Sequence, residues 1–379
     1  MFLDALEKQN SSLINAAIAL HANGELLPDS YIIDVEQFRN NALKIKQKAD
    51  ALGIKLYSMT KQIGRNPYLA KLLEDMGFEG VVAVDFKEAR VLHKSGIKIS
   101  HIGHLVQPPE SMLREIIRDI QPEVITVYSL EKAQSISKIA SELNVKQRIL
   151  VKFYDKDDLL YINQESGFSL STMSDVLAKL SKLDGLIIEG ITHFPCFLHD
   201  GKSVKPTNNL KTLLNVKKNW PSSIQLNQMN IPSATCCETL PMIHGFGGTH
   251  GEPGHALTGT FPANADGSQP EKIAMLYLSE VSHHYVDDSY CFAGGYYRRG
   301  HLNKALVNGE KVLVSNDEPS SIDYHLKLAG KHAIGSPVIM AFRTQIFVTR
   351  SDVVLVDGIQ TGSPKIIGRY TALGDPINE

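Results

Sequence analysis

Lys61 is the side chain whose position in this sequence most directly suggests covalent chemistry. It lies in the segment KLYSMTKQIGRNP, where Lys55–Ser58 is strand-like and residues 67–76 have helical spacing. A lysine just past the C-terminal end of an early strand lies where β/α barrels build their active sites. Once its neighbours depress its pKa, a lysine amine can act there as a Schiff-base residue. A solvated loop lysine has the same local sequence, so Lys61 needs support from other segments.

A glycine-rich stretch, HGFGGTHGEPGHALTGT, covers His244–Thr260. Such a backbone can approach an anion closely and present several N–H groups to it, as phosphate-binding loops do. The same glycines also suit a tight turn that links two domains. The spacing differs from that of the P-loop, GxxxxGK[ST], and this disfavours a Walker-type nucleotide site.

His193 ends a strongly β-like run in the segment ITHFPCFLH. A histidine at a strand end is more often a hydrogen-bonded core residue than a catalyst, so His193 counts only in combination with other residues. Cys196 and His199 follow it, but HxxCxxH is not a recognised zinc pattern. We therefore expect no metal site.

Two tyrosines and two arginines follow a Gly-Gly pair in the segment YVDDSYCFAGGYYRRGH. Tyr296 or Tyr297 could project from a strained turn, or both could be ordinary strand residues on alternate faces. Arg298 and Arg299 could bind a carboxylate or phosphate, or they could lie on a solvated edge.

The elements that would position these residues alternate along the chain, which predicts βα units and a parallel sheet. The expected helices cover 36–51, 67–76, 87–95, 109–119, 130–143, 171–183 and 206–217. The expected strands are Tyr31–Asp34, Lys55–Ser58, Val81–Asp85, Ile99–Leu105, Val124–Tyr128, Ile149–Phe153, Leu186–Ile191 and Ile224–Met229. About eight strands without a switch point favour a (β/α)8 barrel over an open sheet.

After Pro262 the pattern changes to short alternating β runs at 273–286, 311–314, 337–348 and 352–357. The length of 379 residues suits a barrel plus a smaller domain. We therefore predict an α/β protein with a barrel over 31–262 and a β-rich domain over 263–379. Residues 1–30 are expected to form a helical segment that packs with the β-rich domain.

The composition excludes several classes of protein. The 43% hydrophobic and 21% charged residues are typical of a globular protein with a large core. The net charge of -2 gives no basic field, so we expect neither a nucleic-acid nor a membrane partner. Four cysteines without a CxxC pair, no secretory signal and no apolar run of about 18 residues make the cytoplasm the expected location.

In this order, the segments resemble the alanine racemase family of fold type III enzymes that use pyridoxal 5′-phosphate (PLP), and most of all its YhfX-type branch. The lysine segment is similar to the family's V-K-A-N-A-Y-G, although Arg65 stands where the family has a phosphate-binding tyrosine. Thr192-His193-Phe194 is similar to a later T-H-F strand end. Glu252–Gly259, EPGHALTG, aligns with the family's R-P-G-I-A-L-Y-G.

The resemblance implies that Lys61 forms the internal aldimine with PLP and acts as the base on one face of the cofactor. His193 would pack near the ring. The residues that the resemblance places around the phosphate are Gly254 and His255, through backbone N–H groups, with Ser233 or Thr235 and Arg65. Tyr296 or Tyr297 would come from the partner subunit, which implies a homodimer with shared active sites, and Arg298 or Arg343 would meet the substrate carboxylate.

Glu252 departs from the racemase pattern, in which an arginine faces the pyridine nitrogen. A carboxylate there resembles the related decarboxylases and would favour a protonated ring that draws electrons more strongly. We predict a PLP-dependent amino-acid racemase or epimerase that acts at Cα. A decarboxylase with Cys291 as a catalytic group, a D-amino-acid aldolase or dehydratase, and a PLP carrier without turnover remain as alternatives.

Overall fold

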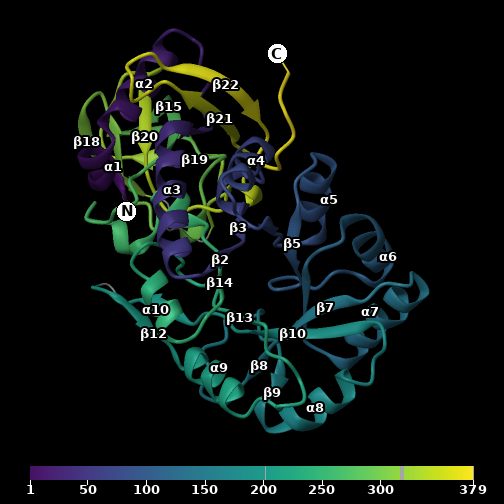
Figure 1. Cartoon of the computed structure of the whole chain (residues 1–379). Coiled ribbons are helices and arrows are strands. Elements are labelled where there is room, and N and C mark those ends of the chain that lie inside the picture. The colour runs from purple at the N-terminus through teal and green to yellow at the C-terminus, as the bar shows by residue number, and fades with distance from the viewer. Residues whose placement is uncertain (201, 316–319, 379) are drawn as a thin grey trace. The chain divides into compact units, whose positions relative to one another are not determined.

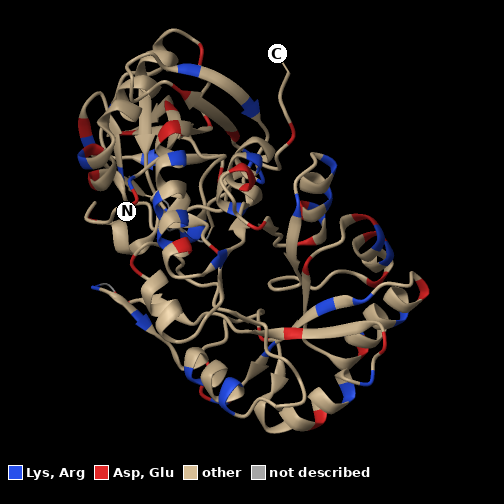
Figure 2. Cartoon of the chain, viewed as in Figure 1, with Lys and Arg blue, Asp and Glu red and all other residues tan. Residues whose placement is uncertain are grey.

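A computed structural model of the chain describes residues 1–200, 202–315 and 320–378 and divides them into two compact units (Figure 1). We call them the barrel unit, Ile45–Thr60 and Pro67–Pro253, and the β-rich unit, Met1–Lys44, Lys61–Asn66 and Gly254–Glu379. Residues of both charge signs are spread along each unit (Figure 2). No described helix combines the length and the apolar character that crossing a membrane requires.

A parallel sheet forms the centre of the barrel unit. Its described segments are β2 (Lys55–Leu56), β3 (Ser58–Met59), β4 (Val81–Val82), β5 (Ile99–Ile102), β6 (Val124–Val127), β7 (Gln147–Val151), β10 (Leu186–Thr192), β13 (Gln228–Asn230) and β14 (His250–Gly251). At one end of the order β2 pairs with β14, and at the other β3 pairs with β4. Because only Tyr57 separates β2 from β3, the sheet closes into a barrel. The predicted barrel fold is confirmed.

Helices follow the strands, and all but the last of them overlap a helix that the sequence pattern predicts. They are α3 (Val35–Ala51), α4 (Pro67–Asp75), α5 (Phe86–Lys94), α6 (Leu113–Glu115), α7 (Leu130–Glu142), α8 (Met173–Leu180), α9 (Asn208–Lys218) and α10 (Leu240–Gly245). The helix α7 buries Ala133, Ile136 and Ala140 at helical spacing. Its first turn is capped by Ser129, whose side chain accepts a hydrogen bond from the Lys132 N–H.

Two short strand pairs belong to segments that follow barrel strands. The first is the parallel pair β8 (Phe153–Tyr154) and β9 (Phe168–Ser169), which encloses residues 155–167. The second is the antiparallel pair β11 (Phe197–His199) and β12 (Val204–Pro206). The segment from 155 to 167 follows β7 and contributes residues to the pocket considered below.

The β-rich unit is built on a sheet with the strand order β16-β19-β18-β17-β20-β15-β1-β21-β22. Its strands are β1 (Ser30–Asp34), β15 (Met275–Tyr285), β16 (Asp288–Phe292), β17 (Lys304–Val307), β18 (Glu310–Ser315), β19 (His325–Leu328), β20 (Pro337–Met340), β21 (Asp352–Asp357) and β22 (Lys365–Tyr370). Most neighbours are antiparallel, but β1 and β21 run parallel.

The prediction that residues 31–34 form the first barrel strand is wrong. Instead, β1 lies in the β-rich sheet, where Tyr31 is opposite Tyr277 of β15 and Val353 of β21. All five residues of β1 are buried, and such an apolar run suits a central strand of either sheet. The pattern of buried residues in β1 alone therefore does not identify the strands with which β1 pairs.

The eighth barrel position is occupied by β14, within the stretch that we predicted to be an anion-binding loop. At Gly251 an added Cβ would lie 2.8 Å from the Thr235 Cγ2 atom, so glycine there allows close packing. The strand predicted at 224–229 also shifts, to β13 at Gln228–Asn230.

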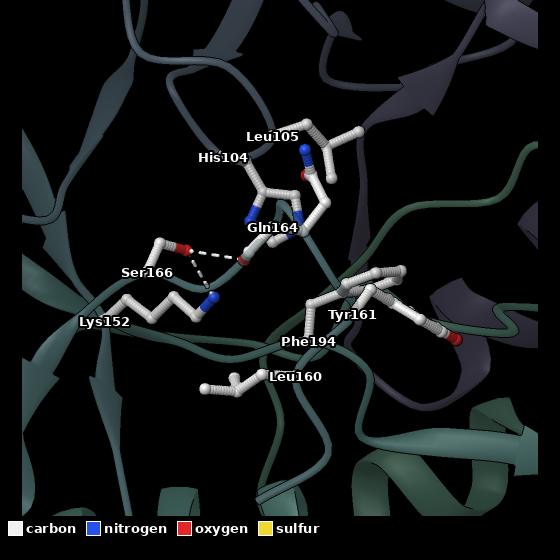
Figure 3. A pocket seen from close by; sticks show the side chains of 8 residues that line it. All are labelled: His104, Leu105, Lys152, Leu160, Tyr161, Gln164, Ser166 and Phe194. Atoms are coloured by element: carbon white, nitrogen blue, oxygen red, sulfur yellow. Dashed lines mark hydrogen bonds between the residues drawn. The ribbon is translucent and has the colours of Figure 1, made fainter.

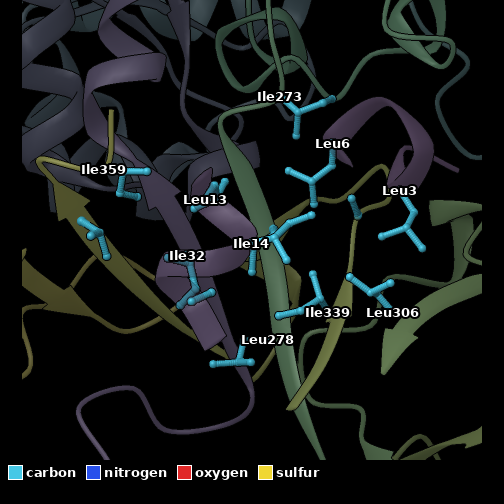
Figure 4. Close-up of a cluster of buried hydrophobic side chains, with 14 of the residues drawn as sticks. Leu3, Leu6, Leu13, Ile14, Ile32, Ile273, Leu278, Leu306, Ile339 and Ile359 are labelled. Carbon is cyan, nitrogen blue, oxygen red and sulfur yellow. The ribbon is translucent and has the colours of Figure 1, made fainter. Parts of the chain in front are cut away.

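The N-terminal residues form two helices, α1 (Leu3–Gln9) and α2 (Ser11–Ala22), which pack on the β-rich sheet. Figure 4 shows Leu6, Leu13 and Ile14 facing Ile32 of β1 and Leu278 of β15. Full burial of a leucine or isoleucine contributes about 1.5–3 kcal/mol to stability. This cluster therefore holds the N-terminal helices against the β-rich sheet.

A buried polar network fixes the Gly-Gly turn that carries the two tyrosines. The Tyr31 hydroxyl lies 2.5 Å from the Gly295 carbonyl oxygen and 2.7 Å from the Thr344 hydroxyl. Asp29 accepts hydrogen bonds from the Gly295 N–H, at 2.8 Å, and from the Tyr277 hydroxyl, at 2.5 Å. These contacts hold the backbone just before Tyr296.

Tyr31→Phe tests this network, because it leaves the buried Gly295 carbonyl and Thr344 hydroxyl without the Tyr31 oxygen. We expect the free energy of unfolding to fall by about 1–3 kcal/mol, measured by urea denaturation followed by circular dichroism. Tyr285→Phe, at a position with 69% exposure, is the control. A Tyr31→Phe protein as stable as the control would contradict a structural role for the network.

Candidate functional site

A buried carboxylate, Glu252, lies directly after β14 in the barrel unit, and its side chain is 1% exposed. Its Oε1 atom lies 2.7 Å from His101 Nδ1 and accepts a hydrogen bond from Asn230 Nδ2 at 2.8 Å. The Oε2 atom finds no hydrogen-bond partner in the described part of the chain. One carboxylate oxygen is therefore held by the barrel, and the other can bind a ligand.

His101 connects Glu252 to a further barrel strand. Its Nε2 atom lies 2.6 Å from the hydroxyl of Thr126 on β6, and the backbone N–H of Glu252 donates to Thr235 at 2.9 Å. Burial alone raises the pKa of Glu252, but the positive potential of His104 and His101 and the two side-chain hydrogen bonds outweigh it. The net pKa of Glu252 lies below its ordinary value, so the carboxylate is ionised.

The residues around Lys61 in the β-rich unit form a cationic group. Lys61 opens a short 3-10 turn, Lys61–Ile63, and the charges of Arg343 and Lys61 act on His255. Burial first, and then these two charges, hold the pKa of His255 well below its usual range. Arg343 Nε lies 3.4 Å from His255 Nε2, so His255 is neutral and accepts from the guanidinium. This arrangement favours an anionic ligand.

Gly254 lies in the same unit, against the turn that follows Lys61. A Cβ atom on Gly254 would lie 2.6 Å from the side-chain oxygen of Gln62, so only glycine allows Gln62 to pack this closely against the backbone. Thr60, which directly precedes Lys61 in the chain, donates a hydrogen bond to the buried Glu88 carboxylate in the barrel unit. The backbone at Gly254 is therefore held by packing against Gln62, and the residue before Lys61 is held by its hydrogen bond to Glu88.

Arg65 and Tyr296 also lie in the β-rich unit. Arg65 is buried with a backbone φ of 53°, and its guanidinium lies 4.8 Å from the centre of the Phe347 ring. Tyr296 is half-buried, and its ring centre is 6.3 Å from that of Phe342. Tyr297, its neighbour, is also half-buried.

The two arginines predicted to bind the substrate carboxylate differ in their surroundings. The exposed Arg298 forms an ion pair with Asp323, with N–O distances of 2.8 and 3.0 Å. Arg343 instead lies beside His255. Arg343 is therefore the better candidate for binding a ligand near Lys61, because the guanidinium of Arg298 is already paired with Asp323.

His193 is fully buried in the barrel unit and has both ring nitrogens engaged. Its Nε2 atom lies 2.8 Å from Asp158, and its Nδ1 atom accepts from the Phe194 N–H at 2.9 Å. Burial lowers the pKa of His193 and outweighs the raising effect of Asp158. His193 is therefore a neutral, rigid ring.

Ser233 and Thr235 have structural contacts in the barrel unit. The Ser233 hydroxyl accepts from the N–H groups of Cys196 and Phe197, at 2.7 and 2.9 Å, and Thr235 holds the Glu252 backbone. Their roles toward a phosphate stay predictions.

Cys291 is fully buried in β16, and burial raises its pKa to about 12. A thiol with that pKa stays protonated at neutral pH and is a poor proton acceptor. Within the described residues, no group of three or more His, Cys, Asp and Glu side chains is arranged to hold a metal ion.

Comparison with known proteins gives the family. Residues 33–262 match the family model of the alanine racemase N-terminal domain, and residues 276–366 match the YhfX-like C-terminal domain. The uncharacterized protein YhfX of Escherichia coli K12 is 50% identical over 387 residues, covering 100% of both chains. The chain belongs to the YhfX-like branch of the alanine racemase family. The resemblance stated from its motifs is confirmed.

Solved structures share the fold at low sequence identity. Alanine racemase from Clostridium difficile 630 has a TM-score of 0.65 and 19% identity, and covers 92% of this chain and 99% of its own. D-threonine aldolase from Filomicrobium marinum gives 0.70 at 13%, with coverage of 92% and 95%. D-threo-3-hydroxyaspartate dehydratase from Delftia sp. HT23 gives 0.67 at 14%, with coverage of 90% and 97%. Members of this fold family are PLP-dependent enzymes that carry out several reactions.

Sequence reasoning missed the residues that hold Glu252. His101, Thr126 and Asn230 are single polar residues in buried strands, and each is fully buried. Two of them fall inside runs that we predicted as barrel strands, 99–105 and 124–128. A polar side chain in such a run was the available signal, because a buried polar group requires a partner.

His250, which precedes Glu252 by two residues, makes the site sensitive to acid. Its ring lies 5.0 Å from that of Tyr57, and burial, with Lys55 as a further cause, lowers its pKa to about 3. The unfolded chain binds a proton near pH 6.5, well before the folded chain does. Stability from His250 is therefore complete above pH 6.5 and is lost as the pH falls toward 3.

His250→Asn should therefore flatten the pH dependence of unfolding between pH 3 and 6.5. We expect the slope of the unfolding free energy to decrease by up to about 1.4 kcal/mol per pH unit, measured by urea denaturation at several pH values. His244→Asn changes an exposed histidine of the same segment and serves as the control. An unchanged slope in His250→Asn would rule out this histidine as an acid-sensitive group.

Proposed function

We propose that this protein is a cytoplasmic, PLP-dependent enzyme that acts at the Cα of an amino acid, with racemisation or epimerisation as its reaction. Family membership supports the cofactor. The observation that carries the proposal is the ionised, buried Glu252 carboxylate, because its Oε2 atom has no partner in the described residues. A buried anion is stable only beside a cation or a hydrogen-bond donor, and a protonated pyridine nitrogen supplies both.

The residues present fit the cofactor. Lys61 would carry it covalently, and Glu252 would bind its ring nitrogen. The phosphate would bind to backbone N–H groups of Gly254 and His255, beside the turn that contains Gln62. Ser233, Thr235 and Arg65 are further candidates for the phosphate, and His193 for packing beside the ring.

When bound, PLP supplies an electron sink that acidifies the Cα–H bond of an attached amino acid. Glu252 keeps the ring nitrogen protonated, because an opposite charge raises the pKa of a base. The Lys61 amine takes the Cα proton on one face, and Tyr296 or Tyr297 returns a proton on the other face. Two acid–base groups on opposite faces invert the configuration. Arg343 orients the substrate carboxylate.

A homodimer is part of this proposal. In it, Tyr296 of the partner subunit or Tyr297 of the partner subunit would complete each active site. The half-buried state of both tyrosines in one chain is compatible with their projection toward another subunit.

Decarboxylation is the nearest alternative, since Glu252 also suits the strong electron sink that loss of CO₂ requires. The buried Cys291, with its pKa of about 12, argues against a thiol as the proton donor or acceptor of that reaction. The fold is shared with a D-threonine aldolase and a D-threo-3-hydroxyaspartate dehydratase, so these reaction classes are also alternatives. A carrier without turnover would need neither the Tyr296-Tyr297 pair nor a second domain.

Lys61→Ala tests the covalent link. The wild-type protein incubated with PLP should absorb in the visible band typical of a lysine-bound cofactor, and Lys61→Ala should lose that band. Lys146→Ala changes an exposed lysine of the barrel unit and should retain it. A colourless wild type that gains no band with PLP would overturn the proposed cofactor.

Glu252→Gln tests the electron sink, since glutamine keeps the shape of the side chain but removes the charge. We expect Cα–H exchange in D₂O to slow by about 100-fold or more, measured by NMR over a panel of D- and L-amino acids, while PLP remains bound. In the wild type, deuterium at Cα without CO₂ release supports racemisation, and CO₂ release supports decarboxylation. Full exchange activity in Glu252→Gln would be inconsistent with the role given to this carboxylate.

A further inference from the structure

A polar pocket lies entirely within the barrel unit, at the C-terminal ends of three barrel strands (Figure 3). His104 and Leu105 follow β5, Lys152 follows β7, and Phe194 follows β10. The remaining lining residues come from the segment between β8 and β9 and are Leu160, Tyr161, Gln164 and Ser166. Three apolar side chains and several polar groups therefore face one space.

Lys152 is the charged group of this pocket, and it is 4% exposed. Its amine donates a hydrogen bond to the Ser166 hydroxyl at 2.8 Å and lies 5.5 Å from the centre of the Tyr128 ring. Burial lowers the pKa of Lys152 to about 8, so the amine is still mainly protonated at pH 7. An ammonium group has three donors, and one of them is directed at Ser166.

The charge of Lys152 is not neutralised by direct contact with an acidic side chain. In the described part of the chain, no aspartate or glutamate forms an ion pair with it. Asp158 acts on it from a distance, but the two Asp158 oxygens are engaged by His193, at 2.8 Å, and Thr212, at 2.7 Å. A buried cation without a direct counter-ion is costly, which favours an anionic ligand as its partner.

The pocket adjoins the residues that hold Glu252. The ring of His104, which lines the pocket, lies 5.3 Å from the ring of His101, and His101 contacts Glu252 at 2.7 Å. All three belong to the barrel unit. A compound that binds beside Glu252 could therefore extend toward Lys152.

We infer that this pocket receives the side-chain carboxylate of an acidic amino acid, with Lys152 as its charged contact and Ser166 as the residue that positions the Lys152 amine. The inference rests on the proposed function, in which Arg343 already meets the carboxylate at Cα. A single ammonium group matches one carboxylate, whereas phosphate sites more often use an arginine fork or several backbone N–H groups. Leu105, Leu160 and Phe194 would pack against the aliphatic part of the side chain.

The first test compares acidic amino acids with their amides on the PLP-loaded protein. We expect Cα–H exchange of aspartate or glutamate to have a kcat/KM at least about 10-fold above that of asparagine or glutamine. Lys152→Met removes the charge and should lower kcat/KM for the acid by about 10–100-fold, while the amide changes by less than about threefold. Lys146→Met, on the exposed surface, is the matched control.

Equal exchange of acids and amides in the wild type would overturn the inference, and so would an equal loss for both in Lys152→Met. Ser166→Ala keeps the charge and removes one hydrogen-bond partner of Lys152. If Lys152→Met does not fold, Ser166→Ala should still lower kcat/KM for the acid by about 3–10-fold, and no change would overturn the inference.

A binding measurement separates this inference from the proposed function. Succinate, a dicarboxylate that cannot react at an amino-bearing Cα, should bind the PLP-loaded protein in isothermal titration calorimetry. Lys152→Met should weaken that binding by about 10-fold or more, and Lys146→Met should not. If no amino acid exchanges but succinate still binds through Lys152, the reaction proposal fails and the pocket assignment stands. If succinate does not bind, or binds equally to Lys152→Met, the pocket assignment fails.

Discussion

The burial of the Glu252 carboxylate is the constraint on which the candidate site depends. An ionised group without water is tolerated only when hydrogen bonds and positive charge compensate for lost hydration. His101 from β5, Asn230 from β13 and the Thr126 hydroxyl behind His101 supply this compensation. Because these residues come from separate strands, the carboxylate is held only when the barrel is closed. β14 brings Glu252 to them by pairing with both β13 and β2.

The chain leaves the barrel unit for the β-rich unit next to this carboxylate. One link is Thr60–Lys61 and the other is Pro253–Gly254. Within the barrel unit, the Met59 N–H donates to the Pro253 carbonyl at 2.9 Å, so the two exits lie on adjacent strands. The lysine proposed to carry the cofactor and the glycine proposed to face its phosphate therefore follow neighbouring strand ends. Within the β-rich unit, Arg343 lies beside His255, and Asp29 holds the turn before Tyr296.

The sequence was sufficient to predict the barrel and most of its strands, because parallel strands with two buried faces appear as apolar runs. It did not identify the partners of β1, since a short buried strand suits either sheet, and β14 is too short to show a period. Motif likeness led to Lys61 and Glu252. His101, Asn230 and Lys152 were missed because their contacts depend on strands far apart in the chain. A polar side chain within or next to a strand-like run was their only local sign.

The most direct test of the central claim is to locate the cofactor chemically. The full-length protein would be loaded with PLP, reduced with borohydride to make the lysine link permanent, and mapped by peptide mass spectrometry. We expect one phosphopyridoxyl group per chain, on the peptide that contains Lys61. Modification spread over exposed lysines, stoichiometric modification of Lys152 instead, or no modification would contradict Lys61 as the residue that carries the cofactor.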